Sequence, residues 1–169
     1  MKRKILSKLI EWKNKKNRKP LIVNGARQVG KTYILKEFGS HYYEKMAYVN
    51  CDKNKTLDKI FSQDYNISRI LLSLSAILHV NIEPENTLII FDEIQENPTV
   101  LNSLKYFCED ASQYHVAVAG SLLGISLHRD TSFPVGKVDM IKMYPMTFDE
   151  FLMAIDAQPL VDVLASKDF

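Results

Sequence analysis

The sequence predicts an α/β protein built on a doubly wound parallel sheet of five strands flanked by helices. Short apolar segments alternate along the chain with segments whose apolar residues recur at helical spacing, and this alternation is typical of parallel sheets covered on both faces. A glycine-rich segment follows the first apolar run and two carboxylates follow the third, so polar groups lie where strands end, as in the ligand sites of such sheets. The expected strands are residues 21–24, 46–50, 88–91, 116–119 and 138–143.

Helices are predicted from periodicity and from capping residues. Asn97 followed by Pro98 supplies an N-cap and a proline at the first helical position, and Thr147 with Glu150 forms a capping box. With 169 residues, 46% of them hydrophobic and 25% charged, the chain is long enough for one domain with a substantial core. The expected helices lie near residues 1–18, 31–38, 57–61, 67–78, 98–108 and 147–155.

The segment between the first strand and the next helix fits the phosphate-binding pattern Gly-x-x-x-x-Gly-Lys-Ser/Thr. Its glycines allow a tight curl with backbone N–H groups turned inward, Lys31 can reach the β- and γ-phosphates, and the Thr32 hydroxyl can bind Mg²⁺. The alternative is a glycine-rich turn before a helix. The residues expected to hold the nucleotide are Gly25, Ala26, Arg27, Gln28, Val29, Gly30, Lys31 and Thr32.

A second signal is the apolar strand that ends in Asp92 and Glu93. Asp92 is expected to hold Mg²⁺, directly or through water, and Glu93 to act as the base that orients or deprotonates the attacking water. The alternative is a strand exit with a solvated pair of charges. The phosphate-binding pattern upstream favours the catalytic interpretation.

The charge of the chain is unevenly distributed. Residues 1–19 contain nine lysine or arginine residues and one acidic residue, Glu11, giving a local charge of +8 within a net charge of +2. Such a basic arm can contact nucleic acid or an acidic neighbouring domain. Because its apolar residues also recur at helical spacing, the alternative is an amphipathic helix that packs on the core with a solvated basic face.

The sequence predicts a cytoplasmic protein without membrane contact. No apolar run reaches membrane-spanning length, and the basic N-terminal residues are not followed by the apolar centre of a secretion signal. Cys51 and Cys108 lack the spacing of a metal site or a disulfide framework. The scattered histidines are not assigned to a metal; they are His41, His79, His115 and His128.

Five segments, taken in order, resemble the bacterial ATPases of the AAA+ type, in which an N-terminal ATPase domain precedes a C-terminal domain of unknown function. These segments are residues 27–32, 87–96, 119–124, 132–138 and 144–152. The resemblance implies a P-loop NTPase fold with strand order 5-1-4-3-2, with ATP and Mg²⁺ as cofactors. The expected division is a basic N-terminal helix (1–18), an ATPase core (19–157) and the start of a linker (158–169) to the C-terminal domain.

The resemblance also assigns roles to residues at neighbouring strand ends. It implies that Ser121 senses the γ-phosphate or the attacking water, and that Asn50 holds Glu93 in an idle orientation. Arg27 is a further family feature. The alternatives are that Ser121 caps the next helix, that Asn50 simply ends a strand, and that Arg27 is a solvated loop residue. The expected catalytic residues are therefore Glu93, Lys31, Ser121 and Asn50.

The leading hypothesis is an ATPase whose hydrolysis drives a conformational change in another domain or partner, with a homo-oligomer as one form of assembly. The alternative is a nucleotide-dependent switch that hydrolyses ATP negligibly. Arg129 and Lys137 are the candidates for a positive charge delivered to a neighbouring subunit, and lysine lacks the planar fork of arginine. A small-molecule kinase is disfavoured by the scarcity of arginine in residues 70–169, and a GTPase by the lack of an Asn-Lys-x-Asp segment.

Overall fold

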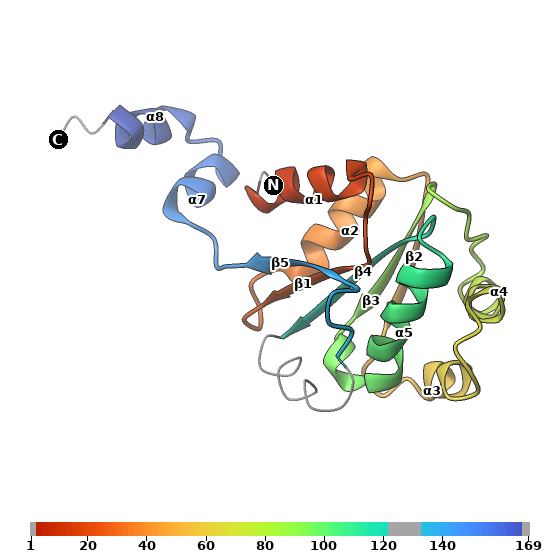
Figure 1. Ribbon diagram of the computed structural model, residues 1–169. Coiled ribbons are helices and arrows are strands. Elements are labelled where there is room, and N and C mark those ends of the chain that lie inside the picture. Colours follow the sequence, from red (N-terminus) through yellow and green to blue (C-terminus); the bar gives the residue numbers. More distant parts are fainter. Residues whose placement is uncertain (1–2, 122–132, 167–169) are drawn as a thin grey trace.

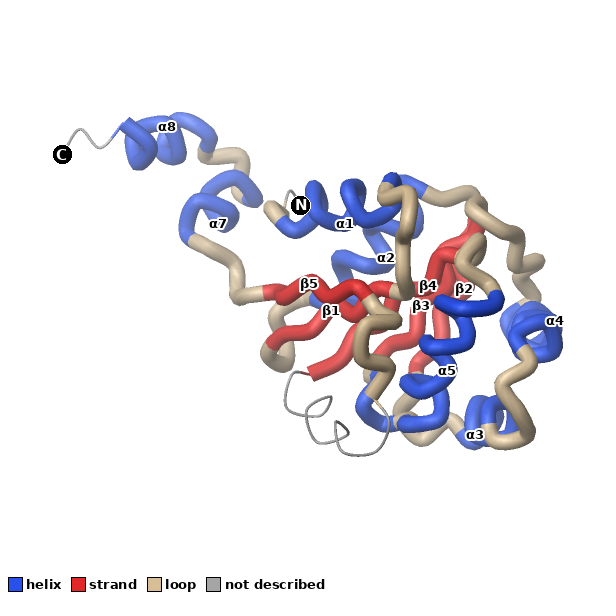
Figure 2. Tube along the Cα trace, viewed as in Figure 1, coloured by secondary structure: helices blue, strands red, loops and turns tan. Residues whose placement is uncertain are grey.

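A five-stranded parallel sheet lies between two layers of helices in the computed structural model, which describes residues 3–121 and 133–166 (Figures 1 and 2). The strand order is β2-β3-β4-β1-β5 and each neighbouring pair is parallel. This is the predicted order, counted from the opposite edge, so the predicted fold is confirmed. The strands are β1 (Leu21–Gly25), β2 (Lys45–Asn50), β3 (Thr87–Asp92), β4 (His115–Ser121) and β5 (Asp139–Met143).

Each face of the sheet has its own hydrophobic core because successive strand residues point to opposite faces. Val23 of β1 packs with α1 (Ile5–Asn14) and α2 (Lys31–Tyr42). Its neighbour Ile22 packs on the other face, in the core that includes α3, α4 and α5. The helices of this second layer are α3 (Lys55–Phe61), α4 (Ile67–Leu78) and α5 (Pro98–Asp110).

The predicted caps form. The Asn97 side chain accepts a hydrogen bond from the Val100 N–H at the start of α5, and Glu150 accepts the Thr147 N–H at 3.0 Å in the capping box of α7 (Phe148–Ala154). Helix α7 and then α8 (Gln158–Ser166) follow β5 and extend away from the sheet (Figure 1). A short 3-10 helix, η1 (Ile94–Glu96), separates β3 from α5.

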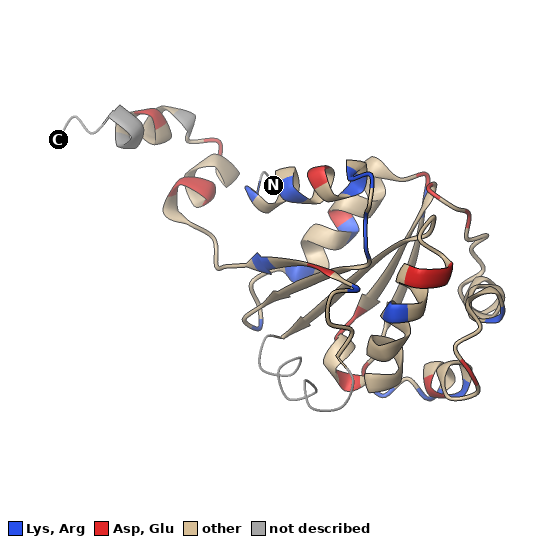
Figure 3. Cartoon of the chain, viewed as in Figure 1, with Lys and Arg blue, Asp and Glu red and all other residues tan. Residues whose placement is uncertain are grey.

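The basic N-terminal segment is attached to the body of the protein. Trp12 of α1 is buried, with its ring 6.5 Å from that of Phe38 and 6.1 Å from that of His115. Lysine and arginine residues are dense on α1 and on the segment that joins it to β1 (Figure 3). Several of them bind the protein itself, since Lys15 pairs with Asp139 at 2.7 Å and Lys19 donates to the Gly136 carbonyl at 2.6 Å. Contact of this segment with nucleic acid stays a prediction.

Among the helices in residues 3–121 and 133–166, none has the length and apolar character needed to cross a membrane.

Candidate functional site

The glycine-rich loop joins β1 to α2 at the carboxyl edge of the sheet. Gly30 has φ +94°, a left-handed conformation that side chains oppose, directly before α2 begins at Lys31. Gly25 is required for a different reason, because a Cβ atom there would collide with the backbone carbonyl of Met143 at the end of β5. The two glycines of the predicted pattern are thus fixed by backbone conformation and by close packing respectively.

Lys31 lies against this loop. Its Nζ donates to the carbonyl oxygens of Gly25 at 3.1 Å and Ala26 at 2.7 Å. Burial lowers the pKa of Lys31, while the negative charges of Glu93 and, to a smaller extent, Asp92 oppose that shift. The ammonium group therefore lies in the electrostatic field of both carboxylates predicted to act with it.

Asp92, at the end of β3, is 4% exposed and meets the helix that follows the loop. Its Oδ2 accepts a hydrogen bond from Thr32 Oγ1 at 2.8 Å and another from the Tyr48 hydroxyl at 2.9 Å. Burial, followed by the hydrogen bond to Asp92, raises the pKa of Tyr48 to about 12, so the phenol keeps its proton and remains a donor. Tyr48 on β2 is a site residue that sequence reasoning missed.

The pair of oxygens from Thr32 and Asp92 suits a magnesium ion. They lie 2.8 Å apart, and adjacent ligands of an octahedral Mg²⁺ are about 2.9 Å apart when each bond is about 2.05 Å long. Mg²⁺ commonly takes one or two protein oxygens and completes its shell with water and phosphate oxygens. A bound Mg²⁺ would neutralise charge on the β- and γ-phosphates.

Glu93 occupies a left-handed backbone conformation, with φ 51° and ψ 44°. Its N–H donates to Asp92 Oδ1 at 3.0 Å, so the preceding carboxylate stabilises this turn. The Glu93 side chain accepts a hydrogen bond from Gln95 Nε2, and Gln95 Oε1 accepts the backbone N–H of Ser121 at 3.1 Å. Gln95 is the second site residue that sequence reasoning missed.

The remaining predicted site residues are placed as follows. Ser121 ends β4 beside Gly25, its partner in the register of β1 and β4. Asn50 ends β2 opposite Asp92, but its Oδ1 accepts the Asp52 N–H at 2.9 Å, and Gln95 rather than Asn50 bonds to Glu93. Arg27 is exposed.

The two candidate cationic donors are not alike. Lys137 precedes β5 at the amino ends of the parallel strands, whereas the loop lies at their carboxyl ends, and it pairs with Glu109 at 2.8 Å. That salt bridge raises the pKa of Lys137. Arg129 lies outside the described residues.

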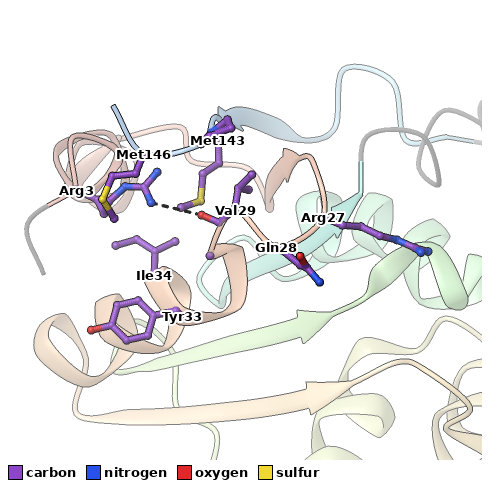
Figure 4. A pocket seen from close by; sticks show the side chains of 10 residues that line it. Arg3, Arg27, Gln28, Val29, Tyr33, Ile34, Met143 and Met146 are labelled. Carbon is purple, nitrogen blue, oxygen red and sulfur yellow. Dashed lines mark hydrogen bonds between the residues drawn. The ribbon is translucent and has the colours of Figure 1, made fainter. Parts of the chain in front are cut away.

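A cavity of about 450 Å³ adjoins the loop (Figure 4). Loop residues 27–30 form part of its lining, and Tyr33, Ile34, Met143 and Met146 add apolar walls. Arg3 also lines it and donates to the carbonyl oxygens of Val29 at 3.4 Å and Tyr144 at 2.9 Å. Figure 4 shows the Arg27 side chain directed away from Arg3 and the two methionines. The cavity is thus continuous with the loop predicted to hold phosphates.

Comparison with known proteins places this site in a family. The model of the AAA domain family matches residues 17–152. The chain belongs to that family. AAA domains are nucleotide-binding ATPase domains and often oligomerise, so this AAA domain belongs to a nucleotide-binding ATPase family.

A solved structure described as the structure of C. elegans PCH-2 is similar to this AAA domain, with a TM-score of 0.49 and 12% sequence identity. The match covers 96% of this chain and 47% of that one, so the chain spans about half the length of that protein. No curated protein matches the sequence.

Proposed function

We propose that this AAA domain binds Mg-ATP and hydrolyses its γ-phosphate. The approach of Thr32 to Asp92 supports the proposal most directly, because it brings a hydroxyl and a buried carboxylate together at 2.8 Å from separate elements, beside Lys31. These are the side chains that hold Mg²⁺ and phosphate in P-loop NTPases. The backbone N–H groups of the loop and the N-terminal end of α2 add positive potential for the phosphates.

In the proposed reaction Glu93 receives a proton from water as the water oxygen attacks the γ-phosphorus. The bond from the γ-phosphorus to the bridging oxygen breaks, leaving ADP and inorganic phosphate. Lys31 stabilises the negative charge on the transferred group, and Ser121 senses the γ-phosphate or the water from the end of β4. The proton is released from Glu93 with the products.

The cavity beside the loop is the proposed place for the adenosine part of ATP. It is continuous with loop residues 27–30, and its apolar walls suit the faces of a purine ring. Arg3 bonds to two backbone carbonyls that border the cavity and so holds the loop and the segment after β5 together. The nucleotide would therefore contact both the phosphate loop and the chain leading into α7.

Hydrolysis coupled to conformational change in another domain or partner is the proposed use of this site, through α7, α8 and the expected linker (158–169). A nucleotide-dependent switch with negligible hydrolysis is the second candidate. It is favoured by the position of Lys137, which is paired with Glu109 at the amino ends of the strands, far from the loop at their carboxyl ends. Hydrolysis that needs a cation from a neighbouring subunit would be slow in a single copy.

Titration with ATP in the presence and absence of Mg²⁺ tests the proposal. Thr32→Val keeps the shape of the side chain but removes the hydroxyl, so we expect it to abolish most of the gain in ATP affinity that Mg²⁺ provides while leaving metal-free binding within about twofold. Thr56→Val, at an exposed threonine of α3, is the matched control. Equal Mg²⁺ dependence in the Thr32 variant and the parent would contradict the assigned metal site, and no measurable ATP binding by the parent would contradict the function.

A further inference from the structure

The side chain of Gln95 connects two strand ends of the site. Its Nε2 donates to Glu93 Oε2 and lies 3.5 Å from Glu96 Oε1, while its Oε1 accepts the Ser121 N–H at 3.1 Å. Gln95 is 7% exposed, while Glu93 and Ser121 are half-buried, so its amide loses solvent on folding and these bonds are costly to lose. The amide thus joins the predicted base to the end of β4.

The chemistry of the partners fixes the orientation of this amide. An ionised carboxylate can only accept hydrogen bonds and a backbone N–H can only donate, so the nitrogen must face Glu93 and the oxygen must face Ser121. Residue 95 therefore needs a side chain long enough to reach both Glu93 and Ser121 and able to donate to one and accept from the other. Methionine has a similar length but supplies neither bond, and glutamate would place a second negative charge beside Glu93.

Gln95 also ties Glu93 to the strand that carries the phosphate loop. Ser121 is the register partner of Gly25, and β4 lies between β3 and β1 in the sheet. The chain of contacts therefore runs from Glu93 through Gln95 and Ser121 to the first glycine of the loop. The bond from Gln95 therefore fixes the Glu93 carboxylate at the carboxyl edge of the sheet, where the phosphate loop also begins.

We propose that Gln95 is a positioning residue that holds the Glu93 carboxylate at the end of β4, the strand whose last residue is the register partner of the first glycine of the phosphate loop. The inference rests on the proposed function, in which Glu93 is the base. Among the described residues, the side chain of Gln95 bonds to Glu93, Glu96 and Ser121, none of which belongs to the phosphate loop, so we expect it to act on the rate of the chemical step more than on ATP affinity. Misplacement of a reacting group by about 1 Å can cost about 100-fold in rate.

Single-turnover hydrolysis and ATP titration on Gln95→Met and Gln95→Glu test this inference, with Gln63→Met at an exposed glutamine as the matched control. We expect both Gln95 variants to hydrolyse ATP about 10- to 100-fold more slowly than the parent, with ATP affinity within about twofold. Their melting temperatures should fall, because Glu93 and the Ser121 N–H lose a partner. The control should match the parent. A Gln95→Met variant as fast as the parent, alongside a slow Glu93→Gln variant, would overturn the inference.

A double variant separates positioning from a general structural effect. If Gln95 acts through Glu93, the Gln95→Met change should slow Glu93→Gln no further, since the group being positioned no longer accepts a proton. If the rate reductions of the two single variants multiply in the double variant, the proposal is overturned. If Glu93→Gln is as fast as the parent, the assigned base fails.

Hydrogen exchange of the side-chain amides, followed by NMR, tests the Gln95 contact without turnover. The Gln95 signals, identified by their loss in Gln95→Met, should exchange more slowly than those of Gln63 and should speed up in Glu93→Ala. Exchange as fast as that of Gln63, or unchanged by Glu93→Ala, would overturn the inference whatever the ATPase activity.

Discussion

At the scale of single residues, the site is assembled from atoms with more than one partner. Asp92 uses Oδ2 to accept from Thr32 and Tyr48 and Oδ1 to accept the Glu93 N–H. If Thr32 turns its hydroxyl oxygen to a metal ion, Tyr48 still fixes the orientation of the carboxylate. Such outer partners hold metal ligands in place and are costly to remove.

Lys31→Ala should weaken ATP binding. The change removes the charged donor that we propose contacts phosphate, a loss of roughly 1.5–3 kcal/mol, or about tenfold or more in affinity. Isothermal titration with Mg-ATP measures the effect, and Lys59→Ala, at an exposed lysine of α3, serves as a control. Equal affinity of the Lys31 variant and the parent would remove Lys31 from the nucleotide site.

Glu93→Gln should separate binding from chemistry. Glutamine keeps the size and polarity of the side chain but does not accept the proton, so we expect ATP to bind normally while turnover falls roughly 10²- to 10⁴-fold. Parallel titration and phosphate-release measurements check both parts. Hydrolysis at the parental rate would show that Glu93 is not the base.

At the scale of elements, the start of α1 and the start of α7 are joined by buried charge. Glu150 accepts the Lys4 N–H at 2.8 Å, and its Oε1 lies 3.4 Å from Arg3 Nε, an ion pair that is not aligned as a hydrogen bond. Arg3 also donates to the Val29 carbonyl in the loop. The N-terminal segment thus bridges the phosphate loop and the first helix after β5.

This contact predicts a pH-dependent stability. Burial tends to raise the pKa of Glu150, but the N–H groups of Thr147 and Lys4 and the charge of Arg3 outweigh it, and the pKa lies below its ordinary 4.5. A depressed pKa stabilises the fold above the unfolded value and the contribution is lost as the pH falls through the folded value. In thermal unfolding, Glu150→Gln should therefore lower the melting temperature near pH 7 and narrow its gap to the parent below about pH 4.5.

Glu11→Gln, at an exposed carboxylate of α1, is the control for that experiment. A gap between the Glu150 variant and the parent that stays constant from pH 7 to pH 3 would show that the charge of Glu150 does not stabilise the fold.

The strands and helices were predictable from sequence where the residues that define them are adjacent in the chain. The five apolar runs end at turn residues, so the predicted strands differ from the observed ones by one or two residues at most ends. The predicted end of α2 near Phe38 was too early, because Gly39 continues the helix. A Cβ there would lie 2.8 Å from the Met46 sulfur, so this glycine serves packing against β2 and does not end the helix.

Residues of the candidate site were predictable where a sequence motif includes them. Lys31, Thr32, Asp92 and Glu93 belong to recognisable patterns, and the structure brings them together. Tyr48 and Gln95 escaped notice because their partners lie in other strands and because an isolated tyrosine or glutamine carries no local signature. Only the strand order shows which ends meet.

At the scale of the whole molecule, a complete catalytic centre is expected to need a neighbour. The rate of phosphoryl transfer rises roughly 10³- to 10⁵-fold when a cation is delivered to the γ-phosphate. Lys137 lies at the amino ends of the strands, whereas the loop of its own chain lies at their carboxyl ends. We therefore expect the 169-residue chain to bind ATP and turn over slowly, with activity per chain rising with protein concentration.

Measuring the ATPase rate against concentration tests this, with Arg129→Ala and Lys137→Ala alongside the parent. If one of these residues is a donor that acts between subunits, its alanine variant should be slow at every concentration. Mixing that variant with a Glu93→Gln chain should restore activity, because the Glu93→Gln chain supplies the cation and the alanine variant supplies the base. A rate per chain that is independent of concentration and unaffected by either change would contradict an incomplete centre.

The left-handed backbone conformation of Glu93 implies a trade-off between ATP turnover and the stability of the fold. A residue other than glycine in that conformation costs about 1 kcal/mol or more, and asparagine or glycine would relieve it. Selection for heat resistance alone would consequently favour replacing the proposed base, and variants gained that way would keep the fold while losing turnover. Engineering of this domain for robustness should therefore leave Glu93 untouched, even though its backbone conformation marks it as a site where the fold can be stabilised.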